Sequence, residues 1–299
     1  MSGAAQAPAT LRDLARPFAI LAGLMFVWGL SIPATKIALA DFPPLALTAA
    51  RYLAAAPCFA VFMTWRPLPP WRDLVAMAGL GMLGIVGGQI LQSVGVMRTA
   101  ASVATMLSAT SPMFIAGFAA LILGQRIGPR HLGGMAVALA GVVTIAWDEH
   151  GTAGATVLGN AIVLSSTASI AAYYVLASKL IARHGAITVA GFTGLFGLLG
   201  LLPPAAWELA SHPATPHVTS VLIILYLGAL VTVAGMWIWL TMLRRIPARV
   251  AAASQFLQPI FGVSGSALIL GEPIAPRFLA GTVLVLTGIA LAIIPRRGG

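Results

Sequence analysis

Charged residues are scarce in this sequence: they make up 8% of its 299 residues, whereas 59% of the residues are hydrophobic. A soluble domain carries about 25% charged residues, which cover the surface that faces water. This chain has too few charges to cover such a surface, and its mean hydropathy is +0.97. The composition therefore excludes a soluble fold for most of the chain and predicts a protein embedded in lipid.

Cysteine is represented by Cys58 alone, in an apolar stretch. A single cysteine excludes a disulfide within the chain and a site built from several thiolates. Acidic residues are also few, with 7 Asp and Glu against 17 Lys and Arg, so the formal net charge is +10. Most of the basic residues lie in short loops or at the ends of apolar stretches, which is typical of membrane topology and not of nucleic-acid binding. We expect no metal, no cofactor and no nucleic-acid partner.

The apolar residues form ten stretches that are separated by charged or Pro/Gly-rich residues. A helix needs about 20 residues to cross about 30 Å of hydrocarbon. The first stretch is too long for a signal-peptide core, so we expect it to be retained. The sequence thus predicts an all-α polytopic membrane protein with ten transmembrane helices, at 17–39, 43–65, 73–96, 99–123, 130–147, 156–181, 186–209, 217–241, 249–270 and 277–295.

The distribution of basic residues predicts the orientation. If the N-terminus is cytoplasmic, Arg98 and Arg277 fall outside the cell, and thirteen basic residues fall on the cytoplasmic side. Cytoplasmic loops of membrane proteins carry such an excess. We therefore expect both termini in the cytoplasm. The thirteen residues are Arg12, Arg16, Arg66, Arg72, Arg126, Arg130, Lys179, Arg183, Arg244, Arg245, Arg249, Arg296 and Arg297.

An internal repeat divides the chain into two halves. Residues 80–141 align with 227–288 without a gap, and 23 of these 62 positions are identical. Apolar composition gives chance matches at Ala and Leu, but not the aligned Pro129 with Pro276 or Gly124 with Gly271. We expect a first five-helix repeat at 1–150 and a second at 151–299. Because five is odd, the second repeat must enter the membrane inverted, as in many secondary transporters. A duplication without a transport role is the alternative.

Several motifs recur along the predicted helices. Trp28-Gly29 with Ser31 lies in the first helix and Arg51 in the second, each half has a Pro in its fourth helix (Pro112, Pro259), and Leu270-Gly271-Glu272 precedes a Gly-rich last helix. These motifs resemble those of the drug/metabolite transporter superfamily, in its EamA-type ten-helix branch. The first half departs from the pattern, with Gln125 in place of the acid. The resemblance covers essentially the whole chain.

The resemblance implies a secondary transporter in the bacterial inner membrane that exports amino acids, including aromatic or other apolar ones, and related metabolites by alternating access. Other relatives of this kind move drugs or nucleotide sugars, and these substrates stay open. The implied partners are a small-molecule substrate and the lipid bilayer, and we expect a monomer.

Pro112 and Pro259 occupy equivalent positions in the two halves. A proline inside a helix leaves the carbonyl four residues earlier without its donor and kinks the helix. Those carbonyls belong to Ser108 and Gln255, and in lipid they need partners in protein or in a cavity. We therefore expect two hinges beside a central cavity, to which Ser111 and Gln258 add polar groups. Ordinary packing kinks are the alternative.

Gln89, Gln92 and Ser93 have the spacing of one helical face. Amides facing hydrocarbon are costly, so we expect this face to point inward. The repeat equivalents are Met236, Trp239 and Leu240, so the cavity would have one amide-rich and one apolar wall. Binding of the amides to a neighbouring helix is the alternative.

Arg51 and Lys36 are the basic residues that lie inside the predicted helices. Lys36 is near a helix end and can reach the interface, whereas Arg51 is deeper and could meet either a substrate carboxylate or a cluster of carbonyls. Further candidates for substrate binding are the aromatic residues Trp28, Tyr174, Trp237 and Trp239. A place in the belt of Trp and Tyr at the membrane interface is the alternative.

All seven acids and all five histidines lie in predicted loops or at helix ends. A proton-driven exporter usually holds a titratable group in its pathway, so we expect downhill export. Glu272, at the rim of the predicted pathway, is the one acid that could argue against this expectation. Gly262-Val263-Ser264-Gly265 resembles a motif of intramembrane serine proteases, but such a serine needs a base within hydrogen-bond reach. We expect no enzyme and no catalytic residues. A channel filter is not recognisable, and a scaffold role would leave the repeat unexplained.

Overall fold

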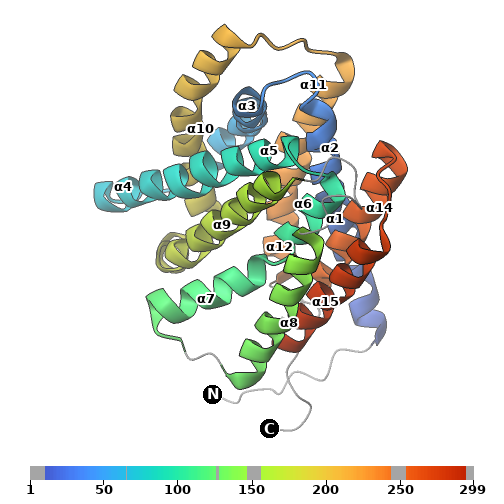
Figure 1. Ribbon diagram of the computed structural model, residues 1–299. Helices are drawn as coiled ribbons and strands as arrows, with labels where there is room; N and C mark the ends of the chain where they lie inside the picture. The colour runs from blue at the N-terminus through green and yellow to red at the C-terminus, as the bar shows by residue number, and fades with distance from the viewer. Residues whose placement is uncertain (1–10, 65, 126–127, 147–155, 244–253, 294–299) are drawn as a thin grey trace, which may run out of the picture.

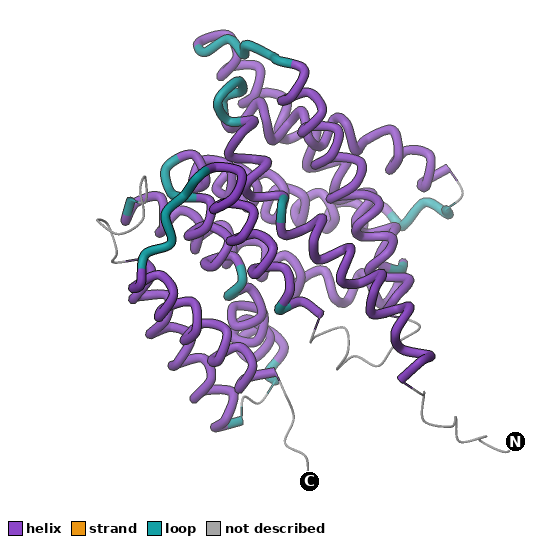
Figure 2. The backbone as a smooth tube through the Cα atoms, turned by 90° about the vertical axis from the view of Figure 1, so that its right-hand side faces the viewer, coloured by secondary structure: helices purple, strands orange, loops and turns teal. Residues whose placement is uncertain are grey.

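The computed structural model describes residues 11–64, 66–125, 128–146, 156–243 and 254–293. Within these ranges every regular element is a helix, and short loops join them (Figures 1 and 2). Helices satisfy their own backbone hydrogen bonds, which lipid cannot do. Several of the basic residues that predict orientation, such as Arg244, Arg245 and Arg297, lie outside the described residues, as do Asp148 and Glu149.

The first half of the chain contains helices α1 to α8, and the second half contains α9 to α15. The first set is α1 Leu11–Gly29, α2 Ser31–Ala38, α3 Pro44–Thr64, α4 Trp71–Leu80, the π-helix η1 Gly81–Gln89, α5 Ile90–Met97, α6 Ala101–Ser108, α7 Ser111–Leu123 and α8 Pro129–Ala146. The second set is α9 Val157–His184, α10 Ala186–Ser211, α11 Val218–Leu225, the π-helix η2 Tyr226–Ala234, α12 Gly235–Leu243, α14 Leu257–Leu270 and α15 Pro276–Ile293.

Seven helical stretches are long and apolar enough to cross a membrane, and three further apolar helices are shorter. Some of the seven join two or three elements, as Trp71–Met97 joins α4, η1 and α5. The shorter ones lie at Pro129–Ile145, Leu257–Leu270 and Pro276–Leu291. The predictions of an all-helical and multi-pass membrane protein are therefore confirmed, and each of the ten predicted stretches overlaps one of these helical segments.

Both predicted hinges are breaks between helices and not kinks within them. Helix α6 ends at Ser108, and α7 begins at Ser111 with Pro112 in its first turn. Likewise, a turn at Phe256 precedes α14, in which Pro259 is the third residue. The first-turn N–H groups of a helix have no partner inside it, so proline there sacrifices no hydrogen bond. The two prolines therefore lie near helix starts, at equivalent positions of both halves.

The repeat seen in the sequence recurs in the helix boundaries. Helices α8 and α15 are each 18 residues long and begin at Pro129 and Pro276, which are equivalent in the alignment. The preceding helices, α7 and α14, are followed directly by Gly124 and Gly271, whose φ values are +67° and +66°. Only glycine adopts this left-handed conformation without strain. The π-helices η1 and η2 also occupy nearly equivalent positions in the two repeats.

Helices α8 and α15 lie side by side and pack closely (Figure 1). A Cβ atom added to Gly141 would come within 2.7 Å of the Gly281 carbonyl oxygen, and one added to Gly288 within 2.5 Å of the Gly134 carbonyl oxygen. Residue numbers rise along one helix as they fall along the other, so the pair is antiparallel. Around it lies the largest buried cluster, which includes Met106, Leu107, Ile145, Phe278 and Val285.

Polar contacts gather several connections at one end of the bundle, which we call the Glu272 end. The Lys36 Nζ donates to the carbonyl oxygens of Val96 and Thr99 at 2.8 and 2.7 Å, where α5 ends. The carboxylate of Glu272 accepts from the N–H groups of Ala101 and Ser102 at 2.6 and 2.8 Å, where α6 begins. A cation at a helix C-terminus and an anion at an N-terminus are both favourable.

Two more connections meet at the Glu272 end. The Thr215 N–H donates to the Asp41 carbonyl oxygen at 2.9 Å, and His217 Nδ1 lies 2.9 Å from the Asp41 carboxylate. At the opposite end, which we call the Asp73 end, the Asp73 carboxylate lies 2.6 Å from His184 Nε2 and 3.5 Å from Arg183 Nη1. The start of α4 is thus held to the end of α9.

Candidate functional site

A cavity of about 820 Å³ lies between helices of both halves of the chain. Eleven of the thirteen residues predicted for binding or as hinges line this cavity. They are Trp28, Arg51, Gln89, Gln92, Ser111, Pro112, Tyr174, Trp239, Gln255, Gln258 and Pro259. The two helix breaks, the amides of η1 and α5, and the aromatic residues of α1 and α12 therefore meet around one space.

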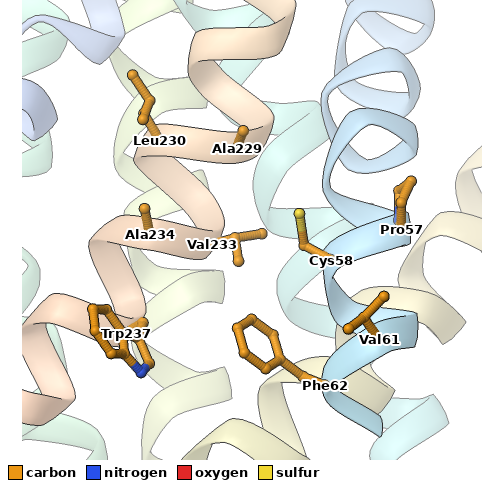
Figure 3. Close-up of a pocket in the computed structure, with 9 residues that line it drawn as sticks. All are labelled: Pro57, Cys58, Val61, Phe62, Ala229, Leu230, Val233, Ala234 and Trp237. Atoms are coloured by element: carbon orange, nitrogen blue, oxygen red, sulfur yellow. The ribbon is translucent and has the colours of Figure 1, made fainter. Parts of the chain in front are cut away.

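Ser93 and Trp237 lie elsewhere. The Ser93 hydroxyl is buried and lies 2.8 Å from the Thr48 hydroxyl, so it joins α5 to α3. Trp237 is 53% exposed and borders a separate groove between α3 and η2–α12. Figure 3 shows this groove, with Cys58 and Phe62 facing Val233 and Trp237. The groove is apolar and on the outside of the bundle, so Trp237 is in the position of a lipid-facing residue.

The two walls of the cavity differ as the repeat predicts. Gln89 and Gln92 of the first half line the cavity, and so do their equivalents in the second half, Met236 and Trp239. Leu240, the equivalent of Ser93, also lines it. One wall can therefore hydrogen-bond a solute, while the other offers apolar contact. Ligand sites commonly combine a mostly apolar lining with a few placed polar groups.

Arg51 enters the cavity from the middle of α3. Its Nε donates to the Thr232 hydroxyl at 3.0 Å, and its Nη1 donates to the Gln89 side-chain oxygen at 3.2 Å. The guanidinium carbon also lies 5.9 Å from the centre of the Tyr52 ring. Arg51 thus binds two side-chain oxygens, one from each half of the chain, and lies against the aromatic ring of Tyr52.

Trp28 is fixed by Val231 of η2, the residue next to the Thr232 that binds Arg51. Its Nε1 donates to the Val231 carbonyl oxygen at 3.0 Å, and its ring lies 5.8 Å from that of Trp239. A π-helix alters the hydrogen-bond ladder, and such segments are frequent at functional sites. Because Trp28 and Arg51 bind Val231 and Thr232, the aromatic pair and the guanidinium lie next to each other.

The helix breaks bring polar backbone and side chains to the cavity wall. Ser108, Ser111, Gln255 and Gln258 flank the two breaks and line the cavity. Among the described residues, the buried Ser108 hydroxyl oxygen has no hydrogen-bond partner. The donor and acceptor capacity of this hydroxyl is therefore unused by the described protein groups.

The cavity extends toward the Asp73 end and stops short of the Glu272 end. Its lining includes Ile181 and Ala186, which flank the connection that carries His184. In the other direction it reaches Ile32 and Thr105 but not the residues that Lys36 and Glu272 hold together. The contacts of Lys36 and Glu272 therefore lie beyond the residues that line the cavity at this end.

The sequence profile of the EamA-like transporter family matches this chain twice, at residues 17–147 and 157–294. The chain belongs to the EamA-like transporter family. The family assignment makes it a membrane transport protein with a small-molecule substrate, and its repeat is present in two copies.

Named relatives of this EamA-like transporter have similar lengths. It is 26% identical to an uncharacterized transporter of Archaeoglobus fulgidus, over 92% of this chain and 97% of the relative. It is 26% identical to a probable amino-acid metabolite efflux pump of Salmonella typhimurium, over 90% and 92%. It is 30% identical to a probable terminal-alkyne amino-acid exporter of Streptantibioticus cattleyicolor, over 88% and 89%.

A solved crystal structure has the same fold. It is 20% identical in sequence, superposes with a TM-score of 0.63, and the match covers 93% of this chain and 96% of the other. At this identity the likeness concerns the fold alone.

The protease-like motif of the EamA-like transporter has a packing explanation. A Cβ atom on Gly262 would lie 2.5 Å from Thr105 Cγ2 and 2.8 Å from the Gly29 carbonyl oxygen, so α14 packs on α6 and α1 there. Gly265 packs in the same way against Leu30. Ser264 itself is on the exposed side of α14. The two glycines of the motif therefore serve close helix packing.

Some cavity residues were missed from the sequence. Thr232, which binds Arg51, and Tyr52, which lies under the guanidinium, both line the cavity. Thr232 precedes Met236 by four residues on an otherwise apolar span, and this spacing could have placed it on the inward face. Tyr52 follows Arg51 directly, and adjacent residues of a helix do not share a face, so no spacing rule pointed to it.

Proposed function

We propose that this EamA-like transporter exports apolar or aromatic amino acids and closely related metabolites by alternating access. The observation that carries the proposal is the cavity, in which amides, an arginine and an aromatic pair from both halves face one space. The amides and Arg51 would hold the polar end of a solute, and Trp28 and Trp239 would hold its apolar body. The names of relatives that export amino-acid metabolites support the same substrate class.

The proposed architecture is ten transmembrane helices in two inverted halves, 1–150 and 151–299. The crossing of α8 and α15 supports it. In the repeat, Gly134 is equivalent to Gly281 and Gly141 to Gly288, so exchanging the halves turns the contact of Gly141 with Gly281 into that of Gly288 with Gly134. An antiparallel pair with this symmetry has its two-fold axis perpendicular to the helices, as inverted repeats require.

The proposed location is the bacterial inner membrane, with both termini in the cytoplasm and the protein acting as a monomer. The Asp73 end then faces the cytoplasm, because Arg66, Arg72 and Arg183 lie there. A cavity that extends toward this end and is closed at the Glu272 end fits a state that loads solute from inside the cell. Export would follow when the Glu272 end opens and the Asp73 end closes.

The proposed energetics are downhill. The acids that the structure describes at the ends of the bundle already have structural contacts: Glu272 caps α6, and Glu208 accepts from the N–H groups of Leu45 and Ala46 at 2.8 and 2.9 Å. Neither carboxylate lines the cavity, which supports downhill transport over coupling to protons. Solute would therefore leave along its own gradient.

Efflux from proteoliposomes tests the proposed function. Purified protein would be reconstituted with a panel of radiolabelled amino acids and their acylated or deaminated relatives, with and without a pH gradient. We expect efflux of apolar members above that from empty liposomes, and less than about a twofold effect of the pH gradient. Accumulation against a gradient, driven by protons alone, would contradict downhill transport, and absence of efflux for the whole panel would contradict the proposed substrate class.

A further inference from the structure

Arg51 carries a positive charge into the cavity without a carboxylate to balance it. The ion pairs among the described residues involve Asp41 and Asp73, both at the ends of the bundle, and none involves Arg51. A guanidinium has five N–H donors, and the described hydrogen bonds use its Nε and one bond from Nη1. Donors and charge therefore remain available on the cavity side.

The remaining lining residues add no charge that would compensate. Among the residues that the structure describes around the cavity, Arg51 alone has an ionised side chain at neutral pH; the other polar ones are Ser, Thr, Tyr, Gln and Trp. Of the acids, Glu208 and Glu272 cap helices, and Asp148 and Glu149 belong to the connection between the two repeats, outside the described residues. An uncompensated charge at membrane depth is costly, and a bound anion would relieve that cost.

We propose that the cavity selects solutes with a net charge of −1: apolar or aromatic carboxylates whose amino group is absent or acylated. The carboxylate binds the free N–H groups of Arg51, and the apolar body lies on Trp28 and Trp239, because both Arg51 and Trp28 are anchored on adjacent residues of η2. A free ammonium group would enter a cavity that is already positive. This inference narrows the substrate class and rests on the proposed function of the cavity.

The charge of the solute has an energetic consequence for export. A monoanion that leaves the cell without a coupled ion moves down the inside-negative membrane potential. One charge across 100 mV corresponds to about a 50-fold concentration ratio at equilibrium. The potential would then drive export without any proton-carrying residue in the cavity, whereas the efflux of a zwitterion would not respond to it.

A set of four phenylalanine derivatives tests the inference on the unaltered protein. N-acetylphenylalanine is an anion, phenylalanine a zwitterion, phenylalaninamide a cation and N-acetylphenylalaninamide neutral, while the aromatic body is the same. Efflux would be measured from proteoliposomes with a potassium diffusion potential, and rates from empty liposomes would be subtracted. We expect N-acetylphenylalanine to leave at least about ten times faster than phenylalanine, and its efflux alone to rise when the interior is made negative.

Arg51→Gln and Arg51→Lys separate charge from shape. We expect Arg51→Gln to lower N-acetylphenylalanine efflux at least about tenfold and to remove its advantage over phenylalanine, while Arg51→Lys keeps part of both. Arg72→Gln, at an exposed position of α4, is the matched control and should leave the rates unchanged.

Phenylalanine efflux that equals or exceeds that of the anion, with no response of the anion to potential, would overturn the inference and leave the proposed export function standing. If neither the four derivatives nor the amino-acid panel moves, the proposed function itself fails. Because the comparison of solutes needs no variant, poor folding of an Arg51 variant would not affect it.

Discussion

At the scale of single residues, Gln92 and Trp239 should be needed for transport. Gln92→Ala removes an amide of the cavity wall, and since one hydrogen bond contributes about 0.5–1.5 kcal/mol, we expect transport to fall about two- to tenfold. Trp239→Ala removes an aromatic contact of the cavity wall, and we expect it to lower the transport rate more than Gln92→Ala does. Initial efflux rates per molecule, with thermal unfolding of the purified variants, would measure both effects.

Trp237→Ala is the matched control, because Trp237 lies two residues from Trp239 but borders the outer groove (Figure 3). Its transport rate should stay at that of the parent. If Gln92→Ala unfolds early yet transports at the parent rate, Gln92 is structural and the site is misplaced.

The comparison of Trp237 with Trp239 also shows how far residue-level prediction reaches. The spacing of Gln89 and Gln92 and the repeat equivalence identified one face of each helix, and these residues line the cavity. Ser93 shares that spacing but binds Thr48, because α3 covers its side of α5. Apolar residues such as Trp237 give no such signal in lipid, where both faces of a helix are hydrophobic.

At the scale of helices, the crossing of α8 and α15 should depend on its glycines. In Gly141→Ala the added Cβ atom would meet backbone atoms 2.7 Å away, which cannot yield without moving a helix. Overpacking of this kind costs about 1–3 kcal/mol, so the melting temperature should fall. In Gly133→Ala, on the same helix, the Cβ atom would meet nothing within 4 Å, and the melting temperature should rise slightly because alanine favours a helix more than glycine does. Equal melting temperatures would contradict the close crossing.

The contacts at the Glu272 end should hold that end closed. Lys36→Ala removes three hydrogen bonds to the carbonyl oxygens of Val96, Met97 and Thr99. A cysteine at position 102, in a Cys58→Ser background, would report opening, because Ser102 is fully buried and its hydroxyl has no hydrogen-bond partner among the described residues. We expect faster labelling by a membrane-impermeant maleimide in Lys36→Ala than in the Lys36 parent.

Arg98→Ala serves as the control for the loss of a basic side chain at the same end, since Arg98 is exposed and its side chain takes no part in the Lys36 contacts. Unchanged labelling in Lys36→Ala would mean that Lys36 stabilises the end of α5 without acting as a gate.

Helix positions were more predictable than helix interruptions. The lengths of the apolar stretches, and the charged or Pro/Gly-rich residues between them, located the helical segments, because the bilayer fixes how many residues a span requires. The π-helices η1 and η2 were not predicted, because their carbonyls are satisfied by distant side chains: Ser169 donates to Leu83 and Trp28 to Val231. Such pairings depend on tertiary contacts between helices that local sequence does not encode.

For the whole molecule, the inverted architecture predicts that the end of the first repeat and the end of the chain lie on opposite sides of the membrane. Five crossings separate residue 150 from residue 297 in a ten-helix topology. The excess of basic residues, thirteen against two, predicts that residue 297 is cytoplasmic. His150→Cys and Arg297→Cys, each in a Cys58→Ser background, would be labelled in intact cells with an impermeant maleimide. We expect labelling at position 150 without permeabilisation and at position 297 only after it. Labelling of both positions from the same side would require an even number of crossings between them. That result would contradict the inverted repeat, and with it the proposed loading direction and the proposed role of the membrane potential in export.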